Sequence, residues 1–556
     1  MRRLMRDISA LLLLAPAASF AASSHVADTG PAHRPLSMAT LMDEALVPGL
    51  QMAVVTKGRI QSVRGVGSAD ADSDSPVTRE TVFEAASLGK PVFAYGVLKL
   101  ASSGRIDLDV PVSRYLPDLK GPAAQLTPRR LLSHTGGLPN GGGKLDVSSV
   151  DIGRFSYSGE GYGLLQRVVE AITHQPLDDY MRAEVFEPLE MKSSSYIWRE
   201  EFKTTKSFGH GFTGANAGRT HIPVARAQSS LETTAADYAR FMLAIVRGQG
   251  LDPAIAREAL RPQVKLERGC LECLGKPKGE LSDRMSWGLG WGLEQTDRGS
   301  FAWHWGDNNT MQSYAAIALD GSRGVVIFTN SSNGHSIMRS IASRKLGVDA
   351  PGYSLGVYAP YRDPARRLLA RIVRRGPAAV TSSDLSLPRT ELIQVAERLM
   401  QGGKPVEAAA LLRRLPGELS IADLALLAEA ERKAGNLEQA RRYAEAALQR
   451  EPSNSKAREA IERISMATRV VAPQILDLYT GRYRTPFGPL EVSRSGAGLA
   501  ASLEDQPKSE MLAMSDNSFL IERMGVPIEF IRGSDGRVSH AVVQAGSPVI
   551  LTRLEP

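Results

Sequence analysis

Hydrophobic and polar residues alternate with a period of two near both ends of the first 345 residues. The alternation predicts a hairpin of strands at 51–58 and 59–65, and four further strands between Trp287 and Asn330. A helical period separates these regions, for example over 161–172. We therefore expect one antiparallel sheet that is built from both ends of this region and flanked by the helices inserted between them.

The pattern changes three times beyond residue 345. Residues 346–389 are rich in Pro, Gly, Arg and Ser, which predicts a linker with one basic helix at 363–375. A strong helical period covers 390–468, where Ala408 and Ala440 align at a repeat spacing of 32, typical of tetratricopeptide-like repeats. We favour a helical spacer over a peptide-binding groove here, with a protein partner left open. Short strands separated by turn residues fill 472–556 and predict a small antiparallel barrel or sandwich.

The N-terminus has the pattern of an export signal. Three arginines within the first six residues precede a short apolar run, Ile8–Ala18, and small residues surround a cleavage site near Ala21. We therefore expect a signal peptide at 1–21, a flexible leader at 22–37 and a periplasmic or secreted protein. The remaining chain has no long apolar run, so no membrane span is expected.

Composition agrees with a multidomain α+β protein. A length of 556 residues exceeds what a single core supports, and 43% hydrophobic with 23% charged residues is ordinary for a globular protein. The net charge of +7 is mild, and the chain has no arm rich in arginine or lysine. A nucleic-acid partner is therefore not expected.

The two cysteines, Cys270 and Cys273, are three residues apart. In an oxidising compartment this spacing fits a small local disulfide, and two free thiols are the alternative. A zinc site would need further ligands, and no histidine is nearby in the sequence. We therefore expect neither a metal nor a cofactor.

A candidate for covalent chemistry is the pair Ser87 and Lys90. Residues three apart share one face of a helix, and Pro91 places the start of a helix at this motif because proline suits the first turn. The positive end of the helix would favour a neutral lysine, which can activate a serine for acyl transfer. The pattern alone is weak, because Ser453 and Lys456 match it between two helical segments.

Three further motifs are candidates for the same site, and one of them, Ser133-His-Thr-Gly-Gly-Leu-Pro139, could be merely a tight loop. Tyr157 is at a glycine-bracketed turn before a helix, where a neighbouring ammonium could lower the phenol pKa and allow proton transfer. His304 and Gly306 are on a predicted strand. Gly306 would let a substrate approach the backbone, whose N–H groups could bind an oxyanion, and His304 would point into the site if Gly306 does.

Four motifs, in this order, resemble those of the serine β-lactamase-related hydrolases, which include class C β-lactamases, D-alanyl-D-alanine peptidases, D-aminopeptidases and esterases. The motifs are Ser87-Leu-Gly-Lys90, Ser133-His-Thr-Gly-Gly-Leu-Pro139, Tyr157-Ser-Gly159 and His304-Trp-Gly306. The resemblance assigns 38–345 to a domain with an antiparallel sheet flanked by helices. Residues 472–556 resemble the small lipocalin-like domain that often follows such hydrolases.

The resemblance also implies roles for single residues. Ser87 would be the acylated nucleophile, and Lys90 and Tyr157 would handle its proton and that of the leaving group. The oxyanion would lie between the backbone N–H groups of Ser87 and Asp307. His304 takes the place usually held by a lysine or histidine on the strand bordering the site.

Three departures from the family pattern bear on the substrate. Gly159 replaces an asparagine whose amide helps to hold a substrate amide in many relatives. A histidine at 304 is more typical of esterase- and aminopeptidase-like members, and the short stretch 139–155 suggests an open site. We therefore predict an exported serine hydrolase acting on esters or on small D-amino-acid amides or peptides.

Alternative functions follow from the same motifs. One is β-lactamase or D-alanyl-D-alanine carboxypeptidase activity, and another is a catalytically weak, penicillin-binding-like sensor or scaffold. A different enzyme class, the α/β-hydrolases, is suggested by 85–89, which faintly resembles a nucleophile elbow. Against it, 79–84 is a poor candidate for the buried strand that an elbow requires.

Overall fold

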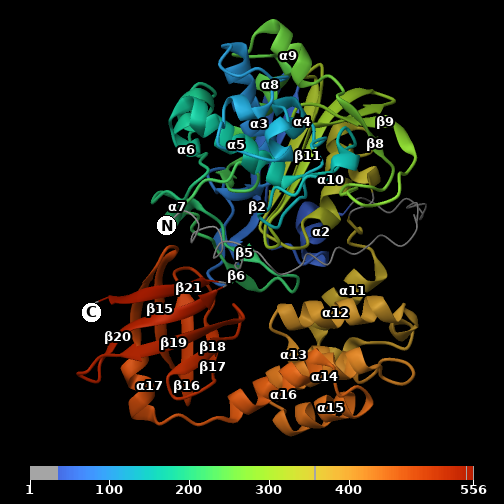
Figure 1. The fold of residues 1–556 in the computed structure, drawn as a ribbon. Coiled ribbons are helices and arrows are strands. Elements are labelled where there is room, and N and C mark those ends of the chain that lie inside the picture. Colours follow the sequence, from blue (N-terminus) through green and yellow to red (C-terminus); the bar gives the residue numbers. More distant parts are fainter. Residues whose placement is uncertain (1–35, 356–357, 546, 555–556) are drawn as a thin grey trace. The chain divides into compact units, whose positions relative to one another are not determined.

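The computed structural model describes residues 36–355, 358–545 and 547–554. The predicted signal peptide and nearly all of the predicted leader lie outside the described residues. The described chain divides into two compact units (Figure 1). One unit contains 36–210 and Ile222–Tyr361, and the other contains Gly211–His221 and the residues from Arg362 onward.

A nine-stranded antiparallel sheet forms the centre of the first unit. Its N-terminal strand β1 (Gly49–Thr56) pairs with the C-terminal strand β13 (Arg323–Thr329), with Met52 opposite Ile327. The prediction of one sheet built from both ends of this region is therefore confirmed. In spatial order the other strands are β3 (Ser75–Pro76) and β2 (Arg59–Asp70) on one side, and β12 (Gln312–Ala318), β11 (Gly299–Asp307), β10 (Gly292–Thr296), β9 (Leu281–Trp287) and β8 (Val264–Glu267) on the other.

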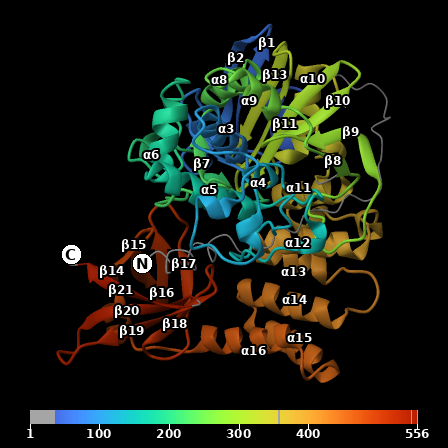
Figure 2. The ribbon, with the colours of Figure 1, turned by 45° about the horizontal axis from the view of Figure 1, so that its top comes forward.

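Helices cover both faces of this sheet (Figure 2). On β13 the side chains of Val326 and Phe328 join one core with helices α3 and α8, while Val325 and Ile327 join a second core with α2 and α10. This alternation follows from the period of two in a strand, and burial of both faces explains why the run Val325–Phe328 in β13 is wholly apolar. The helices of this unit are α2 (Met38–Glu44), α3 (Gly89–Ser102), α4 (Pro128–Leu132), α5 (Gly159–Thr173), α6 (Leu177–Met181), α7 (Phe202–Thr205), α8 (Ala235–Val246), α9 (Pro253–Ala259) and α10 (His335–Leu346).

A small antiparallel pair and two further short strands lie outside the main sheet. Strand β4 (Phe83–Ala86) pairs with β7 (Leu231–Thr233), and the other short strands are β5 (Gly209–His210) and β6 (Asn216–Gly218). All four residues of β4 are buried, so a short buried strand does precede Ser87, contrary to the expectation from 79–84. The α/β-hydrolase alternative fails for a different reason: every pairing within the main sheet and β4–β7 is antiparallel.

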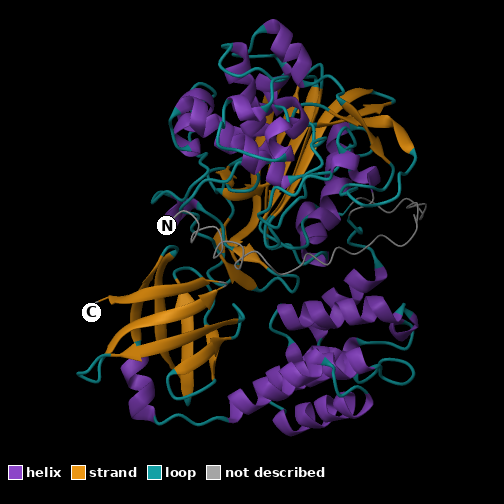
Figure 3. Cartoon of the chain, in the orientation of Figure 1, coloured by secondary structure: helices purple, strands orange, loops and turns teal. Residues whose placement is uncertain are grey.

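The second unit contains a helical segment and a closed barrel (Figure 3). The basic helix expected in the linker is present as α11 (Pro364–Arg375), and Asp363 caps its first turn. Ala408, Ala428 and Ala440 are fully buried, because small side chains let neighbouring helices pack closely. The further helices are α12 (Arg389–Gln401), α13 (Pro405–Leu412), α14 (Ile421–Lys433), α15 (Leu437–Arg450), α16 (Ser455–Thr468) and α17 (Pro473–Tyr479).

The barrel has eight strands, and β14 closes it by pairing with β21. A barrel, rather than a sandwich, is thus what 472–556 form. The tetratricopeptide-like and lipocalin-like assignments of the two segments remain predictions. The strands are β14 (Gly481–Thr485), β15 (Gly488–Ser495), β16 (Gly498–Leu503), β17 (Ser509–Ala513), β18 (Ser518–Ile521), β19 (Val526–Arg532), β20 (Val538–Ala545) and β21 (Ser547–Leu554).

No helix among the described residues is both long and apolar enough to cross a lipid bilayer.

Candidate active site

Ser87 lies in the turn between strand β4 and helix α3. Ala86, immediately before it, has a positive φ of 51°, a conformation that costs energy for a residue other than glycine. Helix α3 begins at Gly89, so Pro91 is in its first turn as the sequence predicted. The hydroxyls of Tyr238 and Tyr196 donate hydrogen bonds to the carbonyls of Leu88 and Gly89, which fixes this turn.

Lys90 reaches back from the first turn of α3 to Ser87. Its Nζ is 3.0 Å from Ser87 Oγ and 2.9 Å from the carbonyl oxygen of Gln228. The side chain is buried, and burial lowers the pKa of Lys90 to about 7. With a pKa of about 7, roughly half of the Lys90 side chains are neutral at pH 7, and a neutral amine can donate to the Gln228 carbonyl and accept the Ser87 proton. Burial, rather than the helix N-terminus invoked from the sequence, is the cause of this shift.

The pKa of Lys90 predicts how activity depends on pH. Only the neutral amine can accept the Ser87 proton, so kcat/KM is expected to rise with pH through about 7 and to level off above it. The profile measured from pH 5 to 9 at constant ionic strength checks this, because the His residues near the site have lowered pKa values and do not titrate in that range. A flat profile from pH 6 to 8 would contradict it.

Tyr157 comes just before helix α5, whose N-cap is Ser158. The phenol is buried, and Lys90 Nζ lies over its ring, 4.7 Å from the ring centroid. Burial raises the pKa of Tyr157 above its usual value, and the neighbouring Ser87 hydroxyl offsets only part of the rise. The expectation of a lowered pKa is therefore wrong, because burial raises the pKa of Tyr157 more than Ser87 lowers it. Tyr157 stays neutral and can act as a proton donor.

His304 is on strand β11 and its ring is 5.9 Å from that of Tyr157. Its Nδ1 is 2.7 Å from the carbonyl oxygen of Trp305, so Nδ1 carries the proton and Nε2 keeps its lone pair. Burial lowers the pKa of His304 to about 3, with a further contribution from Lys90. His304 is thus a neutral hydrogen-bond acceptor and does not supply positive charge.

Gly306 and Asp307 follow on the same strand. A Cβ on Gly306 would be 2.2 Å from the carbonyl oxygen of Ala85 and 2.4 Å from Ser313 Oγ. Glycine is therefore needed for the contact between β11 and β4, and the substrate approach suggested by the sequence stays a prediction. The carboxylate of Asp307 accepts hydrogen bonds from the backbone N–H of Asn309 and from Gln312 Nε2, and the oxyanion role of its backbone N–H stays a prediction.

His134 is a residue of this site that sequence reasoning treated as part of a tight loop. It adopts a positive φ of 57°, and its ring is 4.5 Å from that of Tyr157. The backbone N–H of Ser158 donates to His134 Nδ1, so the proton is on Nε2. The available signal was the histidine beside two glycines in Ser133-His-Thr-Gly-Gly-Leu-Pro139, which alone does not distinguish a site from a turn.

Three buried polar atoms of the site have no hydrogen-bond partner among the described residues. They are the Tyr157 hydroxyl oxygen, His134 Nε2 and His304 Nε2. Buried polar atoms are normally satisfied, so water or a substrate is expected to complete this pocket. The set offers two donors and an acceptor beside a nucleophile, which suits an acyl group more than a purely apolar ligand.

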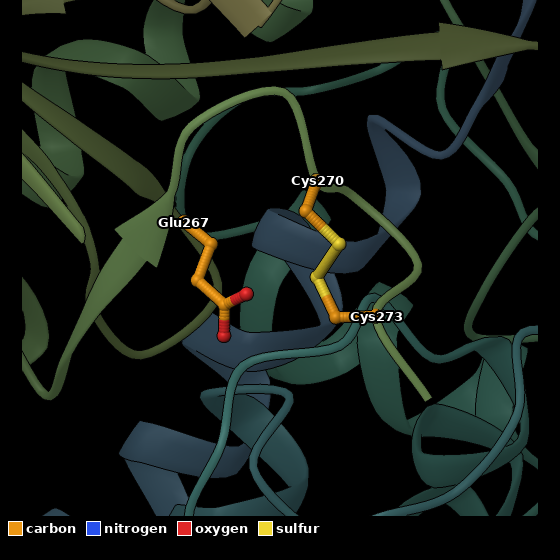
Figure 4. A group of neighbouring side chains, drawn as sticks. All are labelled: Glu267, Cys270 and Cys273. Carbon is orange, nitrogen blue, oxygen red and sulfur yellow. A yellow bond between two sulfur atoms is a disulfide. The ribbon is translucent and has the colours of Figure 1, made fainter. Parts of the chain in front are cut away.

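Cys270 and Cys273 form a disulfide near the carboxylate of Glu267 (Figure 4). The structure thus decides between the disulfide and free thiols left open by the sequence. These atoms do not fit a metal site, because the sulfurs are bonded to each other and the Glu267 carboxylate pairs with Arg154.

The sequence of this chain is similar to those of several known proteins. The Beta-lactamase family model matches residues 37–348, more than half of the chain. Penicillin-binding protein 4 of Amycolatopsis lactamdurans is 27% identical over 364 residues, covering 58% of this chain and 91% of that protein. Esterase EstB of Burkholderia gladioli is 31% identical over 199 residues, covering 29% of this chain and 51% of that protein.

The solved structure of a D-alanine carboxypeptidase AmpC from Burkholderia cenocepacia is 19% identical, with a TM-score of 0.46. The alignment covers 56% of this chain and 96% of that one. The chain spans about half the length of EstB and about a third of the Staphylococcus aureus protein flp, to which it is also similar.

Proposed function

The chain belongs to the Beta-lactamase family, whose members are serine hydrolases, and from this premise we propose that it is an exported serine hydrolase that works through an acyl-enzyme on Ser87. The observation that carries the proposal is the 3.0 Å distance between Ser87 Oγ and the buried Nζ of Lys90, whose pKa is lowered to about 7. A weak hydroxyl nucleophile thereby has a matched base within hydrogen-bond reach.

The reaction follows from the charges at the site. Neutral Lys90 accepts the proton of Ser87 while Oγ attacks the substrate carbonyl, and the backbone N–H groups of Ser87 and Asp307 bind the developing oxyanion. Neutral Tyr157 gives its proton to the leaving group and regains one from the Lys90 ammonium. Water then attacks the acyl-enzyme by the reverse of these proton transfers and releases Ser87.

We propose esters or small D-amino-acid amides or peptides as the substrate class. A Cβ at position 159 would be 2.4 Å from the carbonyl oxygen of Asn140, so the packing there leaves no room for the amide side chain of other family members. The site thus lacks one group that would hold a substrate amide, which favours substrates that depend less on it. The esterase named among the relatives supports the ester branch.

A hydrolysis panel tests the proposal: short-chain nitrophenyl esters, D-alanine nitroanilide and nitrocefin, each assayed with the mature chain. Ester or D-alanine anilide turnover with modification of Ser87 by a fluorophosphonate is the expected result. A folded protein that neither turns over any of the three nor takes the label would overturn it.

A second candidate function is β-lactam hydrolysis or binding, favoured by the penicillin-binding protein among the relatives. Nitrocefin turnover would favour the β-lactamase or D-alanyl-D-alanine carboxypeptidase branch. Slow acylation without turnover would favour a sensor or scaffold, with the helical segment as the place for a protein partner. Location in the periplasm or outside the cell completes the proposal, and fractionation of an expressing cell tests it.

A further inference from the structure

The segment between strands β8 and β9, residues 268–280, contains no helix or strand, yet it lies against the segment that carries Tyr157. Arg154 fixes one end of it: the guanidinium donates to both carboxylate oxygens of Glu267 and to the carbonyl oxygens of Lys276 and Pro277. The backbone N–H of Gly275 donates to Asp151. These contacts join the loop to residues 151–154, just before the catalytic tyrosine.

The contact with Tyr157 itself is made inside the disulfide ring. The backbone N–H of Tyr157 donates to the carbonyl oxygen of Leu271, which stands between the two cysteines, at 2.9 Å. One residue earlier, Ser156 Oγ accepts hydrogen bonds from the backbone N–H groups of Cys273, at 2.9 Å, and Leu274, at 3.3 Å.

On its other side the same stretch is bonded to His134, whose carbonyl accepts from the Ser156 N–H and whose Nδ1 accepts from the Ser158 N–H. Tyr157 is thus held from the loop side by Leu271 and from the opposite side by His134.

Besides the disulfide, a small number of hydrogen bonds hold residues 270–273, including those to Ser156 and Tyr157 just described, one from the Cys270 N–H to Glu267 and one from Asn140 to Glu272. Glu272 and residues 275–280 are exposed, and Cys273 is the one fully buried side chain in 268–280. Gly269 and Gly275, which flank the cysteines, both have positive φ. Glycine has no Cβ, so the backbone at these two positions has more conformational freedom than at other residues. A segment with so few buried apolar contacts has low local stability unless it is cross-linked.

We propose that the Cys270–Cys273 disulfide loop is a positioning element for Tyr157, through the carbonyl of Leu271, and this inference rests on the proposed function of Ser87 and Tyr157. Cleaving the ring frees Leu271 to leave the Tyr157 N–H, and the phenol then loses its fixed place beside Ser87 and Lys90. A misplacement of about 1 Å at a reacting group can cost on the order of 100-fold in rate. The loop therefore affects turnover more than substrate binding.

Reduction tests this without mutation, because Cys270 and Cys273 are the two cysteines of the whole chain. A dithiol reductant such as dithiothreitol supplies two electrons and two protons, the S–S bond becomes two thiols, and the reductant closes to its cyclic disulfide. We expect kcat on a substrate of the panel to fall 10- to 100-fold with KM changed less than threefold, and to recover on reoxidation. The double variant Cys270→Ser/Cys273→Ser is expected to show the same loss and no response to the reductant.

A second arm separates positioning from general destabilisation. In a Tyr157→Phe background, removing the disulfide is expected to cause no further loss of kcat, because the loop acts through the tyrosine. Lys278→Ala, an exposed change on the same loop outside the ring, is expected to leave kcat and the response to reductant unchanged. Circular dichroism of each protein below its Tm confirms that it is folded.

The outcomes test the role of the loop and the role of Ser87 separately. Two results would overturn the positioning role while Ser87 is still labelled by a fluorophosphonate. One is an unchanged kcat in the folded double variant. The other is a loss of kcat on removing the disulfide that is as large in the Tyr157→Phe background as in the wild type. Absence of that labelling in the oxidised wild type overturns the proposed function instead. An equal drop in reduced wild type and double variant, absent in the Tyr157→Phe background, supports the inference.

Discussion

Replacing Ser87 with alanine is expected to lower kcat by about 10⁴- to 10⁶-fold on every substrate that the wild type hydrolyses, because the proposed acyl-enzyme forms on the Ser87 hydroxyl. The hydroxyl is small and the turn is fixed by Tyr196 and Tyr238 from outside, so the free energy of unfolding should change by less than about 1 kcal/mol. Initial rates, and the intact mass after exposure to a fluorophosphonate, measure both parts of the prediction.

The chain provides a matched control for this variant. Ser453 begins the same Ser-x-x-Lys pattern but lies in the connection between α15 and α16, remote in the sequence from every residue of the site. Ser453→Ala is expected to retain full activity and full labelling. If Ser87→Ala kept more than a tenth of the wild-type rate, the nucleophile would have to be another residue.

Replacing Lys90 with methionine is expected to lower kcat by about 10³-fold or more, since a positioned general base contributes on the order of 10² to 10⁴. The same change should stabilise the first unit near pH 7. Lys90 is buried, and holding its pKa at about 7 instead of the usual 10.5 costs the folded state on the order of 3 to 5 kcal/mol, part of which methionine recovers. We expect a net gain of about 2 kcal/mol.

The sign of the pH effect follows from proton binding. Between pH 7 and 10.5 the unfolded chain keeps the Lys90 proton and the folded chain releases it, so the stability of the wild type should gain from this residue as pH rises through that window. The gain should be absent in Lys90→Met. Below pH 7 both states hold the proton and this contribution no longer changes.

Tryptophan fluorescence in urea measures this unit alone. All five tryptophans of the chain, at positions 198, 287, 291, 303 and 305, belong to the first unit. Lys456→Met, at an exposed position of α16, is the matched control and should change neither activity nor this transition. If the Lys90→Met protein were less stable than the wild type at pH 7, burial of the Lys90 side chain would not cost the folded state free energy, which contradicts the prediction.

The sequence by itself determined what depends on residues near one another in the chain. The period of two predicted the strands at both ends of the first region, and Pro91 predicted the start of α3, because strand and helix geometry impose these spacings locally. The spacing of Ser87 and Lys90 likewise predicted their contact. The barrel and the helical segment followed from the same periodicities, although their family assignments do not.

Only the tertiary structure decided what depends on burial and on partners distant in the sequence. Burial sets the pKa of Lys90 near 7, raises that of Tyr157 and keeps His304 neutral, and no local pattern reports how much water reaches a side chain. Gly306 proved to be needed for the approach of β4, and His134 accepts a hydrogen bond from Ser158, the residue after Tyr157. The cysteine pair, for which the sequence suggested a small local disulfide, lies against Tyr157 because the fold brings residues 114 positions apart, Tyr157 and Leu271, into one hydrogen bond.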